Sequence, residues 1–272
     1  MRSSILMVFV SILSITLASQ MALGVDTILF FDNFEGDTVG TLPGMQGGDV
    51  GSYTISAASG DPSATQVWAD GVVGLTGGVH GSDGKYVSVR RATSATGSRL
   101  YTNFDLQGGA IDTTGQVILI SFDLYQPSTA KGLQVLGTTN GGGTVTPRPF
   151  DVRLLPDGSV QYAVDPNQAH TINELHLPFD QWVAIKILVD LGAGAMALTI
   201  GDTTVSNLPL YHPVTTMNSV HFGAMAVAPA GVATPHAHTY LDNIVIRLVP
   251  EPASIFLMAI GGGVLMTRRR CV

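Results

Sequence analysis

Residues 116–126 read QVILISFDLYQ, and this stretch decides the fold class because its side chains alternate between two faces. Successive side chains of an extended strand point to opposite sides of a sheet. One face is wholly apolar and consists of Ile118, Ile120, Phe122 and Leu124. The other is mixed and consists of Val117, Leu119, Ser121, Asp123 and Tyr125. The stretch therefore predicts a long β-strand whose apolar face points into a hydrophobic core.

Similar β-prone runs recur on both sides of this stretch. Residues 156–159 (PDGS) are a strong turn signal and predict a hairpin between residues 150–155 and 160–164. Further strands are expected at residues 27–31, 86–90, 182–191, 196–200, 203–205, 220–228 and 240–249, with loops at 36–84 and 138–149. We find no convincing helix in residues 25–249 and expect one antiparallel β-sandwich domain there.

Composition excludes several classes of protein. The 272 residues carry 20 Asp and Glu against 13 Lys and Arg, a net charge of −7, so we expect no nucleic-acid partner. The single cysteine, Cys271, allows neither an intrachain disulfide nor a cysteine-based zinc site. A domain without disulfides must be held together by its packed core, with or without a metal ion.

The N-terminal segment has the order of a secretory signal peptide. Arg2 supplies the positive charge, residues 5–18 are apolar, and Ala22 and Gly24 place small residues before a cut ahead of Val25. The apolar run of about 14 residues is short of the roughly 20 needed to span a bilayer. We therefore expect residues 1–24 to pass through the Sec translocon and to be removed, although an uncleaved anchor is the alternative.

The C-terminal segment has a different order. Pro250, Glu251 and Pro252 precede an apolar run over residues 253–267, expected to be a short transmembrane helix, and three arginines follow at Arg268, Arg269 and Arg270. A basic cluster after an apolar helix stays on the cytoplasmic side, which places residue 249 and everything before it outside. The alternative is an ordinary C-terminal membrane anchor.

This C-terminal order resembles the PEP-CTERM sorting signal of Gram-negative bacteria, over residues 250–272. The resemblance implies recognition by the membrane enzyme exosortase, transient insertion of the helix in the inner membrane, and removal of the tail. It also implies delivery to the cell surface or the extracellular polysaccharide matrix. Cys271 would leave with the tail.

The segment 25–249 resembles a concanavalin A-like jelly roll of the laminin-G kind. The resemblance is carried by residues 31–36 (FDNFEG), 179–182 (FDQW), 200–202 (IGD) and 240–246 (YLDNIVI). It implies that the first and last strands pair near the middle of a sheet.

Oxygen donors at the two ends of this domain suggest a structural calcium ion. Asp32, Asn33, Glu35, Asp242 and Asn243 would approach one another if the terminal strands pair, and calcium takes six to eight oxygen ligands. The resemblance to carbohydrate-binding sandwiches carries a calcium role over to Glu35 and Asp242. The alternative is that these side chains cap turns or face water.

Other candidate sites are weaker. His236, His238, Tyr240 and Asp242 would share a face of a continuous strand and suggest a zinc or iron site, but neighbouring prolines favour a solvated histidine pair. Residues 25–249 contain only two glutamates, Glu35 and Glu174, and no G-x-S-x-G motif, so we expect no enzyme activity.

Exposed aromatic side chains would allow sugar binding, because aromatic rings stack on sugar faces. The candidates are Trp68, Tyr53, Tyr101 and Tyr211, with core packing as the alternative for Trp68, and Trp182 is expected in the core. The basic residues Lys85, Arg90, Arg91 and Arg99 suggest contact with an anionic polysaccharide.

The leading hypothesis is therefore an exported surface or matrix protein that binds extracellular carbohydrate. A structural or adhesive protein and a polysaccharide lyase or hydrolase are the alternatives.

Overall fold

The computed structural model describes residues 27–44, 49–56, 65–69, 84–90, 99–106, 109–110, 113–139, 147–165, 167–225 and 238–249. These residues form antiparallel strands, and none is helical. The predicted signal peptide at 1–24 and the predicted sorting segment at 250–272 lie outside them. Within the described ranges no helix is long and apolar enough to span a membrane.

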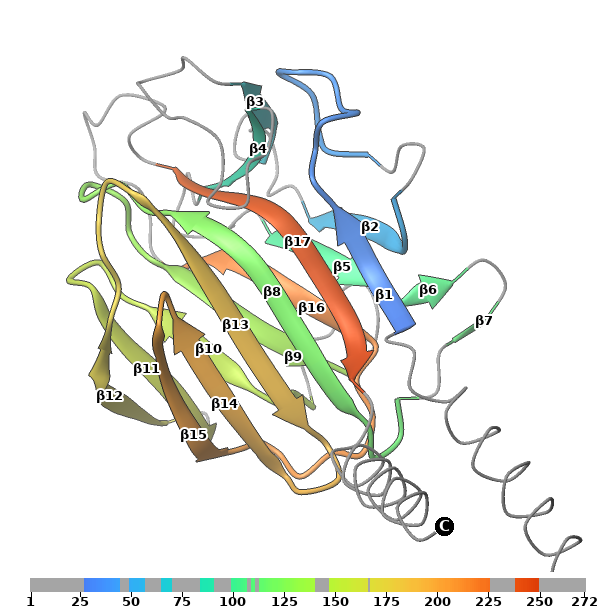
Figure 1. The fold of residues 1–272 in the computed structure, drawn as a ribbon, viewed down its shortest axis with the longest axis vertical. Helices are drawn as coiled ribbons and strands as arrows, with labels where there is room; N and C mark the ends of the chain where they lie inside the picture. The colour runs from blue at the N-terminus through green and yellow to red at the C-terminus, as the bar shows by residue number, and fades with distance from the viewer. Residues whose placement is uncertain are drawn as a thin grey trace, which may run out of the picture.

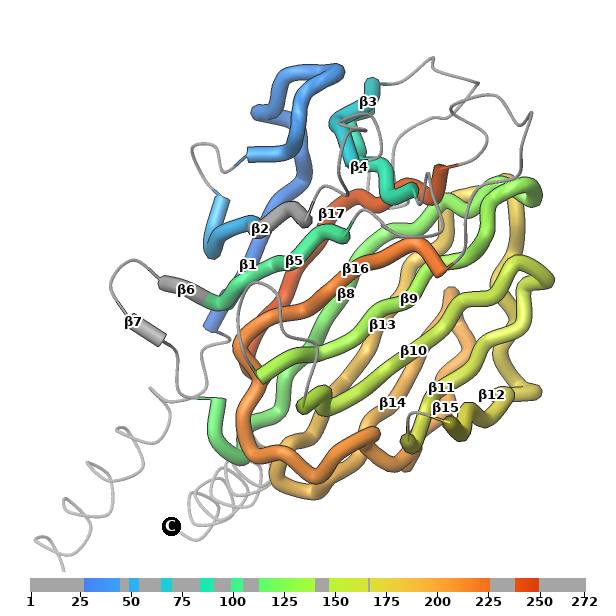
Figure 2. The backbone as a smooth tube through the Cα atoms, turned by 180° about the vertical axis from the view of Figure 1, so that it is seen from behind, coloured from blue at the N-terminus to red at the C-terminus, as the bar shows by residue number. Residues whose placement is uncertain are grey.

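Two antiparallel sheets pack face to face, as predicted (Figure 1). The eight-stranded sheet has the order β15 (Thr203–Pro209), β14 (Ala195–Ile200), β13 (Trp182–Asp190), β8 (Val117–Tyr125), β17 (Thr239–Val249), β4 (Lys85–Val89) and β3 (Val67–Ala69), with β1 (Thr27–Asp32) also paired to β17. The seven-stranded sheet has the order β12 (Gln168–His176), β11 (Ser159–Asp165), β10 (Asp151–Leu154), β9 (Leu133–Thr138), β16 (Ser219–Ala224), β5 (Arg99–Asn103) and β2 (Ser52–Ser56). In Figure 2, which is turned by 180° from Figure 1, this second sheet faces the viewer. A small third pair joins β6 (Asp105–Leu106) to β7 (Gly109–Ala110).

Strand β8 lies between β13 and β17 and confirms the prediction for its apolar face. Ile118, Ile120 and Leu124 are fully buried, and Phe122 is 1% exposed. On the mixed face, Asp123 is also buried, and its Oδ2 accepts a hydrogen bond from Asn243 Nδ2 at 2.9 Å. The polar position thus gains a partner that compensates for its loss of water.

The last strand, β17, pairs with β8 along one of its edges. Along its other edge it pairs with two different strands. Residues 239–241 pair with β4, and residues 244–248 pair with β1. The register against β8 shifts between Asp242 and Val245, and Asn243 has φ 49°, a conformation that asparagine tolerates better than most residues. The predicted pairing of the first and last strands is confirmed, and the bulge at Asn243 marks the change of partner.

Other predictions were met in part. The predicted hairpin across residues 156–159 joins β10 to β11. The strands expected at residues 182–191 and 196–200 are β13 and β14, which pair with each other. The expected loop at 36–84 was wrong in part, because it contains the strands β2 and β3. Strands β5, β6, β7, β9 and β12 were not expected either. The side chains of β12 are mostly exposed, so the strand lacks the apolar alternation by which strands are recognised.

A buried carboxyl group holds the end of β1 against β2. Asp32 is 1% exposed, and its two oxygens accept hydrogen bonds from the Phe34 amide at 2.6 Å and from the Tyr53 hydroxyl at 2.9 Å. Tyr53 in turn packs edge-on against Phe30, with ring centroids 5.0 Å apart. Burial raises the pKa of Asp32 to about 7, and the two hydrogen bonds only partly offset it.

The raised pKa makes stability depend on pH in a specific direction. Between about pH 4, the ordinary pKa of an aspartate, and about pH 7, the folded state binds a proton that the unfolded state has lost. The free energy of unfolding should therefore fall as the pH rises through this window and level off above it. The contribution of Asp32 is on the order of 4 kcal/mol at most.

Urea denaturation at pH 5 and pH 8, with EDTA present, measures this effect. The wild type should lose more stability between the two pH values than an Asp32→Asn variant loses. Asp202→Asn, at an exposed turn, is the control and should follow the wild type. Parallel pH dependence in the wild type and the Asp32→Asn variant would show that Asp32 is not the buried titrating group.

Candidate functional site

The outer side of the seven-stranded sheet carries a cluster of charged side chains. Alternation along β9 and β10 buries Val135 and Val152 in the core, so their neighbours face outward. Arg148 lies just before β10, and Arg99 begins β5. We call this cluster the arginine face; it consists of Arg99, Gln134, Arg148, Asp151 and Arg153.

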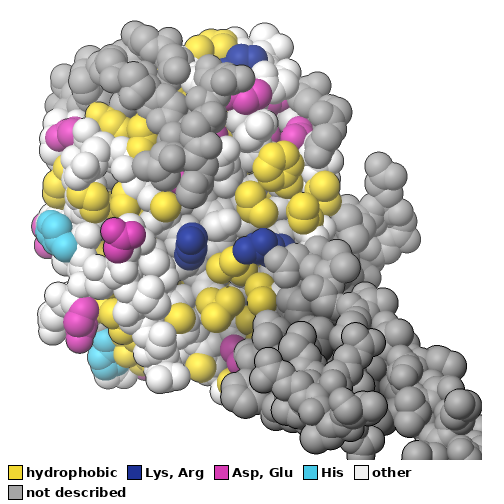
Figure 3. Space-filling view, viewed as in Figure 1, with side chains coloured by type: hydrophobic (Ala, Val, Ile, Leu, Met, Phe, Trp, Pro, Cys, Tyr) yellow, Lys and Arg dark blue, Asp and Glu magenta, His cyan; other side chains and the backbone are white. Residues whose placement is uncertain are grey.

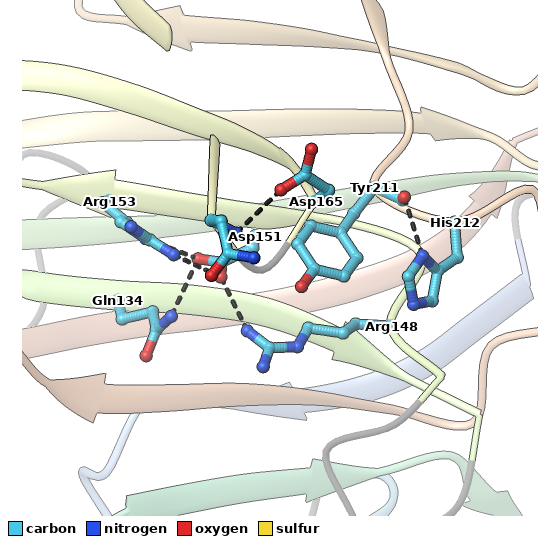
Figure 4. Close-up of polar contacts among 8 residues, drawn as sticks. Gln134, Arg148, Asp151, Arg153, Asp165, Tyr211 and His212 are labelled. Carbon is cyan, nitrogen blue, oxygen red and sulfur yellow. Dashed lines mark hydrogen bonds and ion pairs between the residues drawn. The ribbon is translucent and has the colours of Figure 1, made fainter. Parts of the chain in front are cut away.

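Asp151 is the buried centre of the arginine face (Figure 4). Its carboxylate accepts hydrogen bonds from Arg148 Nη1 at 2.7 Å, from Arg153 Nη2 at 3.2 Å and Nε at 3.3 Å, and from Gln134 Nε2 at 2.8 Å. A buried carboxylate is tolerated when charged partners and hydrogen bonds replace its water. The side chains of the two arginines remain 20% and 24% exposed, so one negative charge holds two positive charges near the surface.

Tyr211 supports one of these guanidinium groups. Arg148 Cζ lies 5.0 Å from the centroid of the Tyr211 ring, within the range of a cation–π contact. The Tyr211 amide donates to the Pro149 carbonyl at 2.8 Å, which ties the segment after β15 to the start of β10. Tyr211, predicted to bind sugar, therefore lies beside the arginine face but is only 4% exposed.

A second aromatic pair lies on the same side of this sheet. Tyr101 of β5 and His221 of β16 are cross-strand partners, and their rings stack with centroids 4.4 Å apart. Both are buried, at 2% exposure each. Burial first, and then the positive charges of Arg99 and Arg148, lower the pKa of His221 to about 3. The imidazole is therefore neutral at physiological pH.

The four predicted sugar-binding residues do not form one site. Tyr101 and Tyr211 lie at the outer side of the seven-stranded sheet, whereas Tyr53 packs against the core. Trp68 belongs to an aromatic cluster on the outer side of the eight-stranded sheet. We call this the outer aromatic cluster; it consists of Trp68, Tyr86, Tyr125, Trp182, His238 and Tyr240. Trp182, expected in the core, lies half-buried in this cluster instead.

The expectation of a solvated histidine pair was wrong for His238. That residue is fully buried, and its ring stacks on Tyr240 and meets Trp68 edge-on. Sequence reasoning took the prolines before it as a sign of an exposed loop. His236 lies outside the described residues.

The three predicted calcium ligands are also separated. Asp32 lies on the core side of its sheet, opposite Ile244, whereas Asp242 pairs with Asp123 on the outer side. Glu35 Oε1 accepts a hydrogen bond from the Lys85 amide at 3.1 Å. Among the residues that the structure describes, no group of three or more His, Cys, Asp or Glu side chains is placed to hold a metal ion. Calcium binding stays a prediction, which a fall in melting temperature on adding EDTA would support.

The predicted basic cluster is divided as well. Lys85 of β4, in the eight-stranded sheet, donates through Nζ to the backbone carbonyls of Glu35 and Asp37 and so holds the segment after β1. Arg99 lies on the arginine face, and Arg91 lies outside the described residues. Sequence reasoning missed Gln134, Arg148, Asp151 and Arg153. The alternation of Asp151 and Arg153 around the buried Val152 was the available signal for two of them.

Comparison with known proteins gives structural similarities only. No family model matches the chain, and no curated protein matches it. A sialidase is similar over 71% of this chain and 16% of its own, with 12% identity and a TM-score of 0.48. The binding domain of botulinum neurotoxin DC in complex with SialylT is similar over 86% of this chain and 50% of its own, with 8% identity and a TM-score of 0.46.

An alginate lyase from Chlorella virus is similar over 73% of this chain and 93% of its own, with 10% identity and a TM-score of 0.45. Unlike the alginate lyase, the sialidase and the toxin binding-domain chain are each matched over less than two thirds of their own length. At these identities and TM-scores the similarities assign neither a family nor a function to this protein.

Proposed function

We propose that this protein is an exported, non-catalytic polysaccharide-binding protein of the cell surface or extracellular matrix. The observation that carries the proposal is the arginine face, where Arg148 lies over the ring of Tyr211 and Arg99 lies beside the stacked pair of Tyr101 and His221. Guanidinium groups donate several hydrogen bonds in a fixed geometry, which suits sugar hydroxyl and carboxylate oxygens.

The distribution of charge supports placing the binding site on this side of the molecule. Residues 25–249 contain nine Lys and Arg against 19 Asp and Glu, yet three of the nine lie on the arginine face. Figure 3 shows the opposite side, over the eight-stranded sheet, where acidic, basic, histidine and hydrophobic side chains are interspersed. A local excess of positive charge on an acidic protein directs an anionic ligand to one face.

The export half of the proposal rests on the two terminal segments. Residues 1–24 have the order of a signal peptide, and Pro250, Glu251, Pro252 and the terminal arginines have the order of an exosortase substrate. The Sec translocon and exosortase are then the partners during export. We assign the β-sandwich between them to the concanavalin A-like jelly rolls.

A polysaccharide lyase is the second candidate, and one observation favours it. Tyr101 and His221 stack beside two guanidinium groups, and residues of these types serve in proton transfer and in neutralising a sugar carboxylate. Because the pKa of His221 is about 3, its imidazole is a weak base, which is why we favour binding over catalysis.

Native gels that contain single polysaccharides, acidic or neutral, test the binding. We expect the purified protein to be retarded by at least one polymer, with at least about tenfold weaker binding in an Arg148→Gln variant because a charge-assisted contact is lost. Lys186→Gln, on the other sheet, is the matched control and should bind as the wild type does.

Retardation by none of the polymers would favour the structural or adhesive alternative. Accumulation of an unsaturated, ultraviolet-absorbing sugar product would establish the lyase instead.

Fractionation of the native host tests the export. The mature protein is expected at the cell surface or in the matrix, and mass spectrometry should find it without residues 1–24 and without Arg268, Arg269 and Arg270. A cytoplasmic protein, or a surface protein that keeps the three arginines, would contradict the proposed processing.

A further inference from the structure

The outer side of the eight-stranded sheet carries a row of four apolar side chains and one arginine that crosses five strands. Cross-strand register places them side by side in the order Ile28 of β1, Arg247 of β17, Leu119 of β8, Leu188 of β13 and Ala197 of β14. Ile28 is 43% exposed and Leu188 is 37% exposed, and they are two of the four large hydrophobic side chains that are exposed among the described residues. We call these five residues the apolar row. Aligned apolar exposure of this kind marks an interaction surface, whereas single scattered side chains do not.

The adjoining row of the same face adds positive charge. It consists of Phe31, Val245, Ser121, Lys186, Thr199 and Thr204. Lys186 is exposed, and Figure 3 shows hydrophobic side chains next to the two basic side chains in the middle of this face. Neither row contains a carboxylate, and the flanking carboxylates on β8 and β13 are Asp123, which is fully buried, and Asp190, whose Oδ1 accepts a hydrogen bond from the Ala193 amide at 2.7 Å. The two rows therefore combine exposed apolar surface with positive charge.

The end of β17 lies beside the apolar row and leads toward the membrane. Val249 is two residues past Arg247, and only residues 250–252 separate it from the apolar run at 253–267. That run, followed by three arginines, has the order of a membrane-inserted segment. An extended chain spans at most about 3.6 Å per residue, so residue 253 is within about 14 Å of Val249. Insertion of the run would thus hold the apolar row next to the bilayer surface.

An anionic lipid surface fits this face better than a second copy of the chain does. A second copy would present the same lysine and arginine, with no carboxylate in either row to pair with them, and like charges repel across an interface. Anionic headgroups give Lys186 and Arg247 opposite charges, and the boundary of the acyl chains accepts the side chains of Ile28 and Leu188. The short connection at 250–252 also raises the effective concentration of lipid at the face.

We propose that the apolar row and Lys186 bind the anionic lipid surface of the membrane in which residues 253–267 are inserted. This inference rests on the export half of the proposed function and adds a lipid partner on the side opposite the arginine face. Membrane binding through one weak signal becomes stable only when a second signal is added. Removal of the tail should therefore release the domain from the membrane, and the arginine face points away from the bilayer throughout.

Fluorescence of the full-length protein in lipid vesicles tests the contact. Cys271→Ser removes the only native cysteine, so that Thr204→Cys or Thr171→Cys carries a single nitrobenzoxadiazole label. Thr204 is exposed and belongs to the row beside the apolar row, whereas Thr171 is exposed on β12 of the other sheet. The vesicles contain phosphatidylcholine with or without phosphatidylglycerol, and doxyl-labelled lipids quench a fluorophore that contacts the bilayer.

The label at residue 204 should be quenched in vesicles that contain phosphatidylglycerol, and the label at residue 171 should not. Ile28→Ser combined with Leu188→Ser should lower the ratio of bound to free face about tenfold, because two partly exposed aliphatic side chains no longer enter the lipid. The matched control is Val39→Ser combined with Leu42→Ser, which changes side chains that are 47% and 44% exposed in the segment after β1. It should keep the quenching of the unsubstituted protein, and melting temperatures check that each variant folds.

Flotation of the vesicles separates failure of the apolar row from failure of the proposed function. Protein that does not float with the vesicles would reject insertion of residues 253–267 and the proposed exosortase processing with it. Protein that floats but is quenched equally at residues 204 and 171, or is unaffected by the Ile28 and Leu188 substitutions, would reject the apolar row alone. Equal quenching without phosphatidylglycerol would overturn the anionic lipid assignment. Energy transfer between labelled copies, in place of quenching by lipid, would assign the face to a second copy instead.

Discussion

The contact between Phe122 of β8 and Phe222 of β16 joins the two sheets, and the exposed chemistry depends on it. Their rings meet edge to face, with centroids 5.1 Å apart, and both side chains are buried. Because strand side chains alternate, placing Phe222 in the core sends His221 and Gly223 to the outer side. A shift of one residue in β16 would turn His221 and Gly223 into the core and expose Phe222. The packing of the core therefore fixes the position of the candidate site.

The sequence predicts the elements whose signal is local. The apolar face of β8 and the hairpin at residues 156–159 were expected, because alternation and turn residues are visible within a few positions. The pairing of β1 with β17 was expected only from the resemblance to laminin-G-like jelly rolls, and no local pattern indicates it. Strand β12 was missed because most of its side chains are exposed, and β2 because the residues around it are rich in glycine and serine.

The candidate site depends on contacts that a single sequence does not reveal. Tyr101 and His221 are partners only because β5 and β16 are neighbours, and Arg99 and Gln134 share a row only because both pair with Gly223 of β16. Asp151 with Arg153 was accessible in principle, since a charged residue on each side of a buried valine marks an outward-facing pair. The buried state of His238 was not accessible, because it depends on Trp68 and Tyr240. Net acidity also concealed the site, since three arginines are gathered on one face of a chain with a charge of −7.

The two outer surfaces of the sandwich offer different chemistry, which makes the location of ligand contact the most direct test. Nuclear magnetic resonance titration of the isotope-labelled protein with a polysaccharide that it binds would map that location. The account predicts that the largest shift changes fall on outward-facing residues of β5, β9, β10 and β16, with Arg99 and Gly223 among them. Changes centred on Trp68, Trp182 and the rest of the outer aromatic cluster would contradict it.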